Sequence, residues 1–204
     1  MPRFFVPSEN FDGQSVKITG DDAYHIARAL RMAVGDEVTI ADMQGRQHIC
    51  RLTKIRDEAC ECEILTTEEG NTESPAEITL YMGYPKGDKL EVVIQKSVEL
   101  GASRIVPFES SRCVKKPKSE KIEKQNARLA RIAEEAAKQC GRSILPKVRP
   151  PVSFSEAIRE AKDADIPLFC YEGDGTVSLK SALADAVGKR TVSVIVGCAQ
   201  YKGL

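Results

Sequence analysis

The chain has 204 residues, of which 42% are hydrophobic and 29% are charged, and its 30 basic residues balance 30 acidic ones. This composition is typical of one large or two small globular domains, and it excludes disordered, collagen-like and low-complexity chains. No apolar run approaches the roughly 18 residues that span a bilayer, and residues 1–11 lack a secretory signal pattern. We therefore expect a soluble, cytoplasmic protein with no membrane partner.

The seven cysteines show no metal-binding pattern. No two of them form a Cys-x-x-Cys pair, and zinc spacing is absent. Cys60 and Cys62 alternate within a strand-like stretch, so both are expected on one face of a strand. We therefore predict no metal site, and we interpret the thiols as small buried hydrophobic groups in a reducing compartment.

The first 70 residues predict a small β-barrel that carries one helix. The barrel strands are expected over residues 3–6, 37–41, 48–55 and 59–65. The helix is expected over residues 21–32, with Thr19 or Asp21 as N-cap and with Ile26, Ala29 and Leu30 turned inward. The domain assignment is 1–70 for the barrel, 71–76 for a linker and 77–204 for a second domain.

The second domain alternates strands with helices. Strands are expected over residues 78–84, 104–108, 167–171 and 192–196, and helices over 87–101, 119–140, 154–161 and 179–187. Gly101 is the expected C-cap of the first of these helices. Such alternation predicts an α/β fold with a mostly parallel sheet covered on both faces, in which ligands bind beyond the carboxyl ends of the strands.

Charge is distributed unevenly along the chain. Residues 86–150 carry 16 basic and 8 acidic residues, a net charge of +8, whereas residues 1–70 carry 8 basic and 13 acidic residues, a net charge of −5. The basic block fits a surface that binds a polyanion, and it fits equally a solvated face without a partner. The charge pattern alone leaves both interpretations open.

Familiar catalytic and nucleotide-binding signatures are absent, including G-x-G-x-x-G, the Walker loop, G-x-S-x-G and H-E-x-x-H. Lys86 and Lys89 flank a turn that opens a helix, where backbone N–H groups and lysines suit either a phosphate or plain solvent. Arg112 follows a strand directly, so we expect it to point into the crevice at the sheet edge. Glu135 and Arg142 are spaced to share one helix face with Gln139.

Several strings, taken in order, closely resemble the RsmE family. In the first half they are Arg3-Phe4-Phe5-Val6, His25 with Leu30-Arg31-Met32, and Gly35-Asp36-Glu37-Val38. In the second half they are Tyr84-Pro85-Lys86-Gly87-Asp88-Lys89-Leu90-Glu91, Ile94-Gln95-Lys96-Ser97-Val98-Glu99-Leu100-Gly101-Ala102, Ile105-Val106-Pro107-Phe108 with Ser111-Arg112-Cys113-Val114, Arg131-Ile132-Ala133-Glu134-Glu135-Ala136-Ala137-Lys138-Gln139-Cys140-Gly141-Arg142, and Pro146-Lys147-Val148. The resemblance runs from the N-terminus to about Gly197. Any one string is weakly specific, but their order and spacing make chance agreement improbable.

The resemblance implies fold and activity. It implies an N-terminal PUA-like β-barrel that holds RNA and a C-terminal SPOUT-type α/β domain whose trefoil knot binds S-adenosylmethionine. It also implies a homodimer that transfers a methyl group to N3 of a uridine in small-subunit (16S) ribosomal RNA. Chemically, the developing anion of the base needs a nearby cation, and a carboxylate can accept the proton.

The resemblance and this chemistry together assign three sets of candidate residues. The catalytic candidates are Arg112, Arg142 and Glu135. The cofactor-binding candidates are Tyr171, Glu172, Val196 and Gly197. The RNA-binding candidates are Arg3, His25, Arg28, Arg31, Lys86, Lys89, Lys96, Lys115 and Lys116.

The resemblance ends after Val196-Gly197. The family continues with a Gly-Pro-Glu-Gly-Gly loop, a further strand and a helix, whereas this sequence reads Cys198-Ala199-Gln200-Tyr201-Lys202-Gly203-Leu204. This departure predicts an incomplete knot. It favours, as an alternative to an active methyltransferase, a catalytically inactive fragment that binds RNA, and it leaves the dimer in question. A generic α/β enzyme with another nucleotide ligand is a third, weaker hypothesis.

Overall fold

The computed structural model describes residues 1–70, 72–85, 87–110, 122–171, 173–184 and 186–197. It divides into two compact units. The first unit comprises Met1–Glu73 together with Ala137–Leu145, and the second comprises Ser74–Ala136 together with Pro146–Leu204. A short segment from the middle of the chain therefore belongs to the first unit, which the linear boundaries 1–70, 71–76 and 77–204 do not anticipate.

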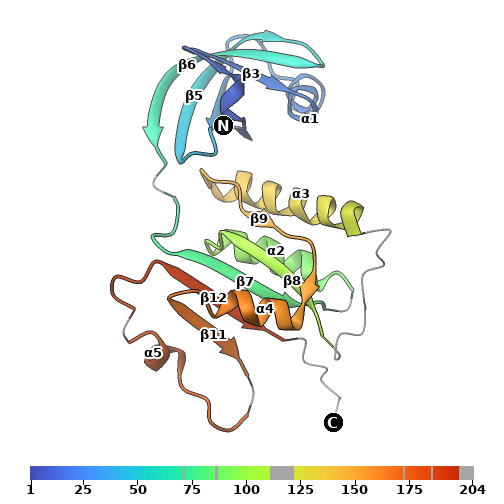
Figure 1. The fold of residues 1–204 in the computed structure, drawn as a ribbon. Coiled ribbons are helices and arrows are strands. Elements are labelled where there is room, and N and C mark those ends of the chain that lie inside the picture. Colours follow the sequence, from blue (N-terminus) through green and yellow to red (C-terminus); the bar gives the residue numbers. More distant parts are fainter. Residues whose placement is uncertain (71, 86, 111–121, 172, 185, 198–204) are drawn as a thin grey trace. The chain divides into compact units, whose positions relative to one another are not determined.

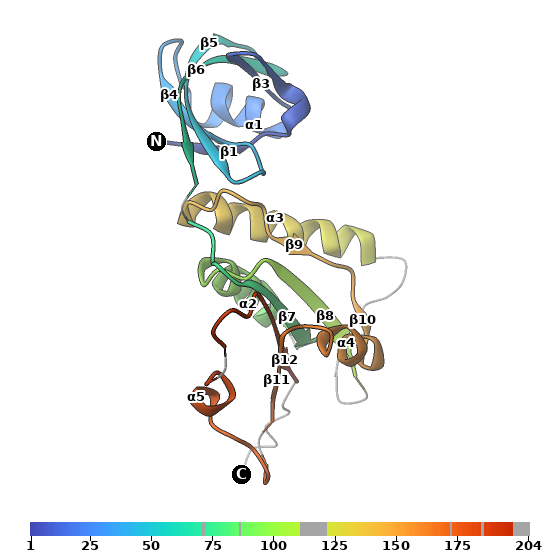
Figure 2. The same cartoon turned by 60° about the vertical axis from the view of Figure 1, so that its left-hand side comes forward.

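The first unit is built on a strongly curved six-stranded sheet (Figure 2). Its strand order is β1-β4-β5-β6-β3-β2, and every pairing except the parallel β1–β4 pair is antiparallel. The strands are β1 (Arg3–Phe5), β2 (Phe11–Asp12), β3 (Ser15–Thr19), β4 (Glu37–Ala41), β5 (Arg46–Ile55) and β6 (Ala59–Glu69), with the 3-10 turn η1 at Ser8–Asn10. The four predicted strands are confirmed, whereas β2 and β3 were not predicted.

The core of the first unit comes from alternating strand residues that point to one face. Its largest fully buried side chains include Phe4, Ile18, Ile40 and Leu52, each at most 2% exposed. Burying a side chain of this size contributes about 1.5–3 kcal/mol. Cys60 and Cys62 lie in the same cluster, as their alternation predicts.

The cysteine prediction is only partly right. Cys50, Cys60 and Cys62 are buried, but Cys140 and Cys170 are exposed at the end of a helix and on an edge strand. Cys113 and Cys198 lie outside the described residues.

The helix of the first unit differs from its prediction. It consists of α1 (Asp21–Tyr24), which begins after Gly20, and a π-helical continuation η2 (His25–Ala29). The predicted N-caps Thr19 and Asp21 are therefore wrong, and Ala29 and Leu30 are exposed rather than inward. The wider π turn rotates the following residues away from the face that a regular 3.6-residue period predicts.

The second unit is a parallel α/β sheet. Its strand order is β10-β8-β7-β12-β11, with β9 paired to β8, and every pairing is parallel. The strands are β7 (Glu77–Gly83), β8 (Arg104–Glu109), β9 (Lys147–Val148), β10 (Val152–Ser153), β11 (Ile166–Cys170) and β12 (Thr191–Val196). The predicted parallel sheet is confirmed.

Helices cover both faces of this sheet, as the strand–helix alternation predicts. The helices are α2 (Lys89–Glu99), α3 (Ile122–Cys140), α4 (Phe154–Ala161) and α5 (Leu179–Ala182). Right-handed crossovers put α2 on one face and α4 on the other, which Figures 1 and 2 show. Ala157 and Ala161 of α4 pack against Tyr81, Val106 and Ile195 of the sheet.

Helix α2 ends where the sequence indicates. Gly101 has a φ of 96°, its N–H donates to the Val98 carbonyl, and the Ala102 N–H donates to the Ser97 carbonyl. This is the Schellman arrangement, which requires a left-handed residue and therefore favours glycine.

Candidate cofactor and RNA sites

Three of the four cofactor-binding candidates lie side by side at the carboxyl edge of the parallel sheet. Strands β11 and β12 pair so that Cys170 lies opposite Val196. Tyr171 and Gly197 directly follow these two paired residues, so the Tyr171 side chain and the Gly197 backbone lie at the same edge of the sheet. Glu172 lies outside the described residues.

A row of aromatic rings leads to Tyr171. The ring centroids of Phe108 and Phe154 are 5.4 Å apart, those of Phe154 and Phe169 are 6.5 Å apart, and those of Phe169 and Tyr171 are 6.4 Å apart with only 22° between the ring planes. Phe169 and Tyr171 are 51% and 61% exposed. Exposed rings of this kind can stack on a nucleobase.

Phe154 and Phe169 do not stand out in the sequence. One sequence feature could have identified Phe169. In Phe169-Cys170-Tyr171 the two aromatic residues alternate with a cysteine, which places both rings on one face of a strand.

Tyr84, directly after β7, is a polar residue at this edge that the sequence did not single out as a site residue. Its side chain is buried, and its hydroxyl has no hydrogen-bond partner among the described residues. Burial, and then the nearby Glu109 carboxylate, raise the pKa of this phenol, so it stays a neutral donor. A buried hydroxyl without a partner is costly, which makes it a candidate ligand contact.

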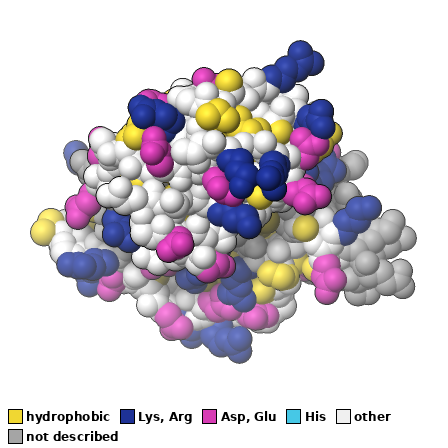
Figure 3. Space-filling view, turned by 90° about the horizontal axis from the view of Figure 1, so that it is seen from above, with side chains coloured by type: hydrophobic (Ala, Val, Ile, Leu, Met, Phe, Trp, Pro, Cys, Tyr) yellow, Lys and Arg dark blue, Asp and Glu magenta, His cyan; other side chains and the backbone are white. Residues whose placement is uncertain are grey.

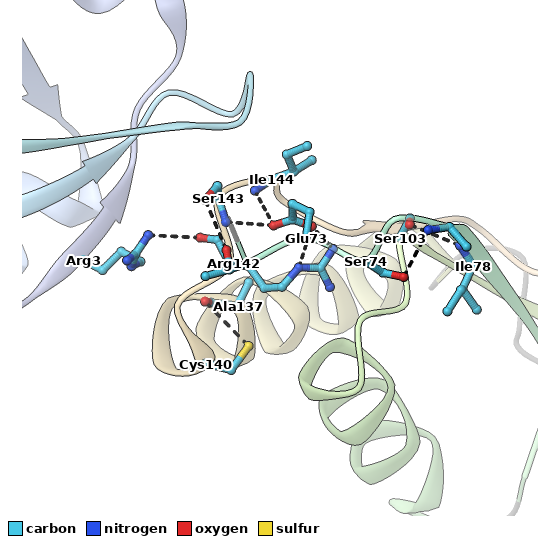
Figure 4. Close-up of polar contacts among 12 residues, drawn as sticks. Arg3, Glu73, Ser74, Ile78, Ser103, Ala137, Cys140, Arg142, Ser143 and Ile144 are labelled. Atoms are coloured by element: carbon cyan, nitrogen blue, oxygen red, sulfur yellow. Dashed lines mark hydrogen bonds and ion pairs between the residues drawn. The ribbon is translucent and has the colours of Figure 1, made fainter. Parts of the chain in front are cut away.

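Arg142, a catalytic candidate, is held by Glu73 within the first unit (Figure 4). Its Nε lies 2.8 Å and its Nη2 2.5 Å from Glu73 Oε2, and its side chain is only 5% exposed. The same carboxylate accepts hydrogen bonds from the backbone N–H groups of Ser143 and Ile144. This geometry favours a structural role for Arg142, and a role at the reacting base stays a prediction.

Glu135 is exposed on the second half of α3. Helix α3 follows β8 and runs back from the carboxyl edge of the sheet, and Glu135 lies 13 residues beyond its first residue, about 20 Å along the axis. Within one chain, the structure therefore does not bring Glu135 together with Tyr171 and Gly197. Arg112 lies outside the described residues.

The RNA-binding candidates fall into two groups. Some already have partners: Arg28 with Asp57, Lys96 with Glu99, and Arg3 with the Arg142 carbonyl and Gln47. Others are exposed and enter no ion pair within the described part of the chain, namely His25, Arg31 and Lys89. Lys86, Lys115 and Lys116 lie outside the described residues.

On the face that Figure 3 shows, surface charge by itself does not mark an RNA site. Figure 3 shows Lys and Arg side chains interspersed with Asp and Glu over the visible face.

Across the described ranges, no three His, Cys, Asp or Glu side chains are grouped to hold a metal ion. None of the described helices is both long and apolar enough to cross a membrane.

The class of protein, an RNA methyltransferase with a PUA domain, follows from comparison with known families. Two family models match, an RNA methyltransferase PUA domain over residues 18–65 and an RNA methyltransferase domain over residues 72–199. The chain belongs to the ribosomal RNA small subunit methyltransferase E family. It is 32% identical over 202 residues to that protein from Bacillus subtilis (strain 168), covering 96% of this chain and 79% of the relative.

Solved structures of methyltransferases also match this chain. A ribosomal RNA small subunit methyltransferase E from Neisseria gonorrhoeae, bound to S-adenosyl methionine, matches with a TM-score of 0.83 and 31% identity, covering 97% of this chain and 79% of that one. A methyltransferase from Legionella pneumophila, in complex with the cofactor SAM, matches with a TM-score of 0.84 and 29% identity over 96% and 78% of the two chains. The PUA-like and SPOUT-type fold expected from the sequence is thereby confirmed.

Proposed function

We propose that this chain is an S-adenosylmethionine-dependent methyltransferase that acts on N3 of a uridine in small-subunit ribosomal RNA. The observation that carries the proposal is the match to relatives with S-adenosyl methionine bound, which covers 97% and 96% of this chain. The inactive RNA-binding fragment, kept as an alternative, is not favoured by these matches.

The residues at the sheet edge fit the cofactor. S-adenosylmethionine supplies an electrophilic methyl group on a sulfonium, and it presents an adenine ring and polar ribose oxygens for recognition. Tyr171 offers an exposed ring for stacking, and the Tyr84 hydroxyl offers an unpaired donor. Among the described residues, no atom lies within 4 Å of the position that a Cβ at Gly197 would take, so these residues leave its backbone open to a ligand.

The chain's own charged residues would act on the base. The uridine N3–H must be lost or strongly polarised before its nitrogen can attack a methyl group. We assign the stabilisation of the developing anion to Arg112 and the acceptance of the proton to Glu135. Because Glu135 lies far along α3 from the carboxyl edge of its own chain, this second assignment requires that a second copy of the chain supply Glu135 to the site.

We propose a homodimer in the cytoplasm, with small-subunit ribosomal RNA bound through the first unit and through the basic block of residues 86–150. Light scattering after size-exclusion chromatography would give the mass directly, and one chain mass would contradict the dimer.

The deciding experiment is a calorimetric titration of S-adenosylmethionine into the folded 204-residue chain, followed by methyl transfer to unmethylated small-subunit RNA. We expect micromolar binding, about −8 kcal/mol, and N3-methyluridine in the nuclease digest. A folded chain that releases no heat and transfers no methyl group would overturn the proposal and support the RNA-binding fragment instead.

A further inference from the structure

The segment from Tyr24 to Arg31 has two unusual backbone features next to each other. Residues His25–Ala29 form a π-helical turn, in which the Leu30 N–H donates to the His25 carbonyl over 2.9 Å. Arg31 then adopts a φ of 52°, the left-handed region that helix ends normally reserve for glycine. Each feature costs free energy, and such outliers concentrate at functional sites.

The two faces of this segment differ. Ala23 and Ile26 are fully buried in the core of the first unit, which fixes the inner face. On the outer face Tyr24 is 59% exposed, and Arg31 is exposed as well. An aromatic ring and a cation are thus held in water, where neither contributes to the core.

Arg28 and Arg31 differ in their partners. The guanidinium of Arg28 donates from Nε and Nη2 to the Asp57 carboxylate, at 2.9, 3.0 and 2.5 Å, so its charge is already compensated. The hydrogen bonds and charge of Asp57 raise the pKa of the Arg28 guanidinium, as this pairing predicts. Arg31 enters no ion pair within the residues that the structure describes.

The net charge of the region limits how it can bind RNA. Residues 1–70 carry a net charge of −5, so a general electrostatic field does not attract a polyanion to them. Stacking of an unpaired base on an aromatic ring does not depend on net charge, and one phosphate needs only one uncompensated cation. Tyr24 and Arg31 provide these two groups, and both lie inside the matched PUA domain.

We propose that Tyr24 and Arg31 form a contact site for an unpaired stretch of RNA, in which Tyr24 stacks on a base and Arg31 binds a phosphate. The left-handed backbone of Arg31 is retained, at a cost in stability, because it presents the guanidinium to solvent at the end of the π turn. This inference rests on the proposed function, since it requires an RNA substrate.

The test measures the affinity of the full chain for a labelled single-stranded ribosomal RNA oligonucleotide and for its duplex, by fluorescence anisotropy. We expect Tyr24→Leu to weaken single-strand binding about tenfold, within the range for loss of one stacked base, and to leave duplex binding unchanged. Tyr24→Phe keeps the ring and should bind within about twofold of the parent chain, by the same stacking argument.

Arg31→Gly separates a binding role from a structural one. Glycine accepts a positive φ without strain, so the variant should melt at the same temperature or higher. Its RNA affinity should fall, and its log–log salt slope should become shallower by about 0.7, the loss of one phosphate contact. Met43→Gly is the matched control, because Met43 has a φ of 59° elsewhere in the same unit, and its RNA affinity should not change.

The outcomes distinguish the two proposals. If the parent chain binds no RNA and transfers no methyl group, the proposed function fails and this inference fails with it. If the parent chain binds RNA while Tyr24→Leu and Arg31→Gly bind equally well, only the inference is overturned.

Discussion

Glu73 and Arg142 form an ion pair that joins the segment before the second unit to the loop after α3. Arg142 donates from Nε and Nη2 to the carboxylate, and the Ser143 and Ile144 N–H groups complete the contacts (Figure 4). A buried guanidinium that is neutralised in this way is stabilising only while its partner is present.

Glu73→Gln should therefore destabilise the chain by about 2–4 kcal/mol, below the upper range for a broken buried pair because Glu73 is 20% exposed. Urea denaturation measures the loss. Glu77→Gln is the matched control, since its pair with Arg104 is exposed and should change stability by less than about 1 kcal/mol. Equal effects of the two variants would contradict the structural role of the Glu73 pair.

The same pair makes stability depend on pH. Burial alone raises the pKa of the Glu73 carboxyl, but the hydrogen bonds from Arg142, Ser143 and Ile144 outweigh it and lower the pKa below its ordinary 4.5. The pair thus contributes fully above pH 4.5, and its contribution is lost as the pH falls through the lowered pKa. Unfolding measured between pH 3 and 6 should show a smaller acid loss in Glu73→Gln than in the parent chain.

Replacing Gly101 should lower the free energy of unfolding. Its φ of 96° is positive, and an added Cβ would meet the Ser74 Cβ at an ordinary 3.5 Å, so the penalty is conformational rather than steric. We expect Gly101→Ala to lose about 1 kcal/mol and Gly101→Asn to lose less, because asparagine tolerates the left-handed region better. Chemical denaturation ranks the three chains, and a more stable alanine variant would refute the argument.

The described cysteines should react at different rates. Burial raises the pKa of Cys50 and Cys62 to about 12, and Cys60 is buried too, whereas Cys140 and Cys170 are exposed. A brief treatment of the native chain with N-ethylmaleimide should label Cys140 and Cys170 and spare the other three. Peptide mapping by mass spectrometry reads out the labels, and early modification of Cys62 would show that the core of the first unit opens readily.

Arg112→Ala should abolish most methyl transfer, by about 10²–10³-fold, if Arg112 stabilises the developing anion of the base. Arg159→Ala is a matched control, because Arg159 is an exposed arginine of α4 that lies outside the basic block of residues 86–150. Single-turnover transfer from labelled cofactor measures both variants. Unchanged turnover in Arg112→Ala would remove the residue from the mechanism.

The sequence predicts regular elements well where the apolar period is strong. Strand β4 and helix α4 begin and end at the predicted residues, and the parallel sheet follows from the alternation of strands and helices. Strand β2 has only two residues and β3 only five, too short for their alternation to stand out. The π turn at residues 25–29 is invisible to a 3.6-residue period.

The candidate site was harder to predict for physical reasons. Tyr171 and Gly197 could be brought together because strand order places the ends of neighbouring parallel strands at one edge. The partner of Arg142 could not be predicted, because Glu73 is 69 residues away and no local pattern links the two. The helical period predicts which face of α3 carries Glu135. It does not predict how far Glu135 lies from the carboxyl edge of the sheet, because that distance depends on how α3 packs in the folded domain.

The discontinuous make-up of the first unit has a consequence for synthesis. A growing chain emerges from its N-terminus, so the six strands of the first unit appear before Ala137–Leu145. Until that segment has been synthesised, the Glu73 carboxylate has none of the three donors that contact it in the folded chain. These are the Arg142 guanidinium and the backbone N–H groups of Ser143 and Ile144. The first unit therefore matures only after much of the second has been translated, and a gene cut at the linker would yield a first unit that lacks its final segment.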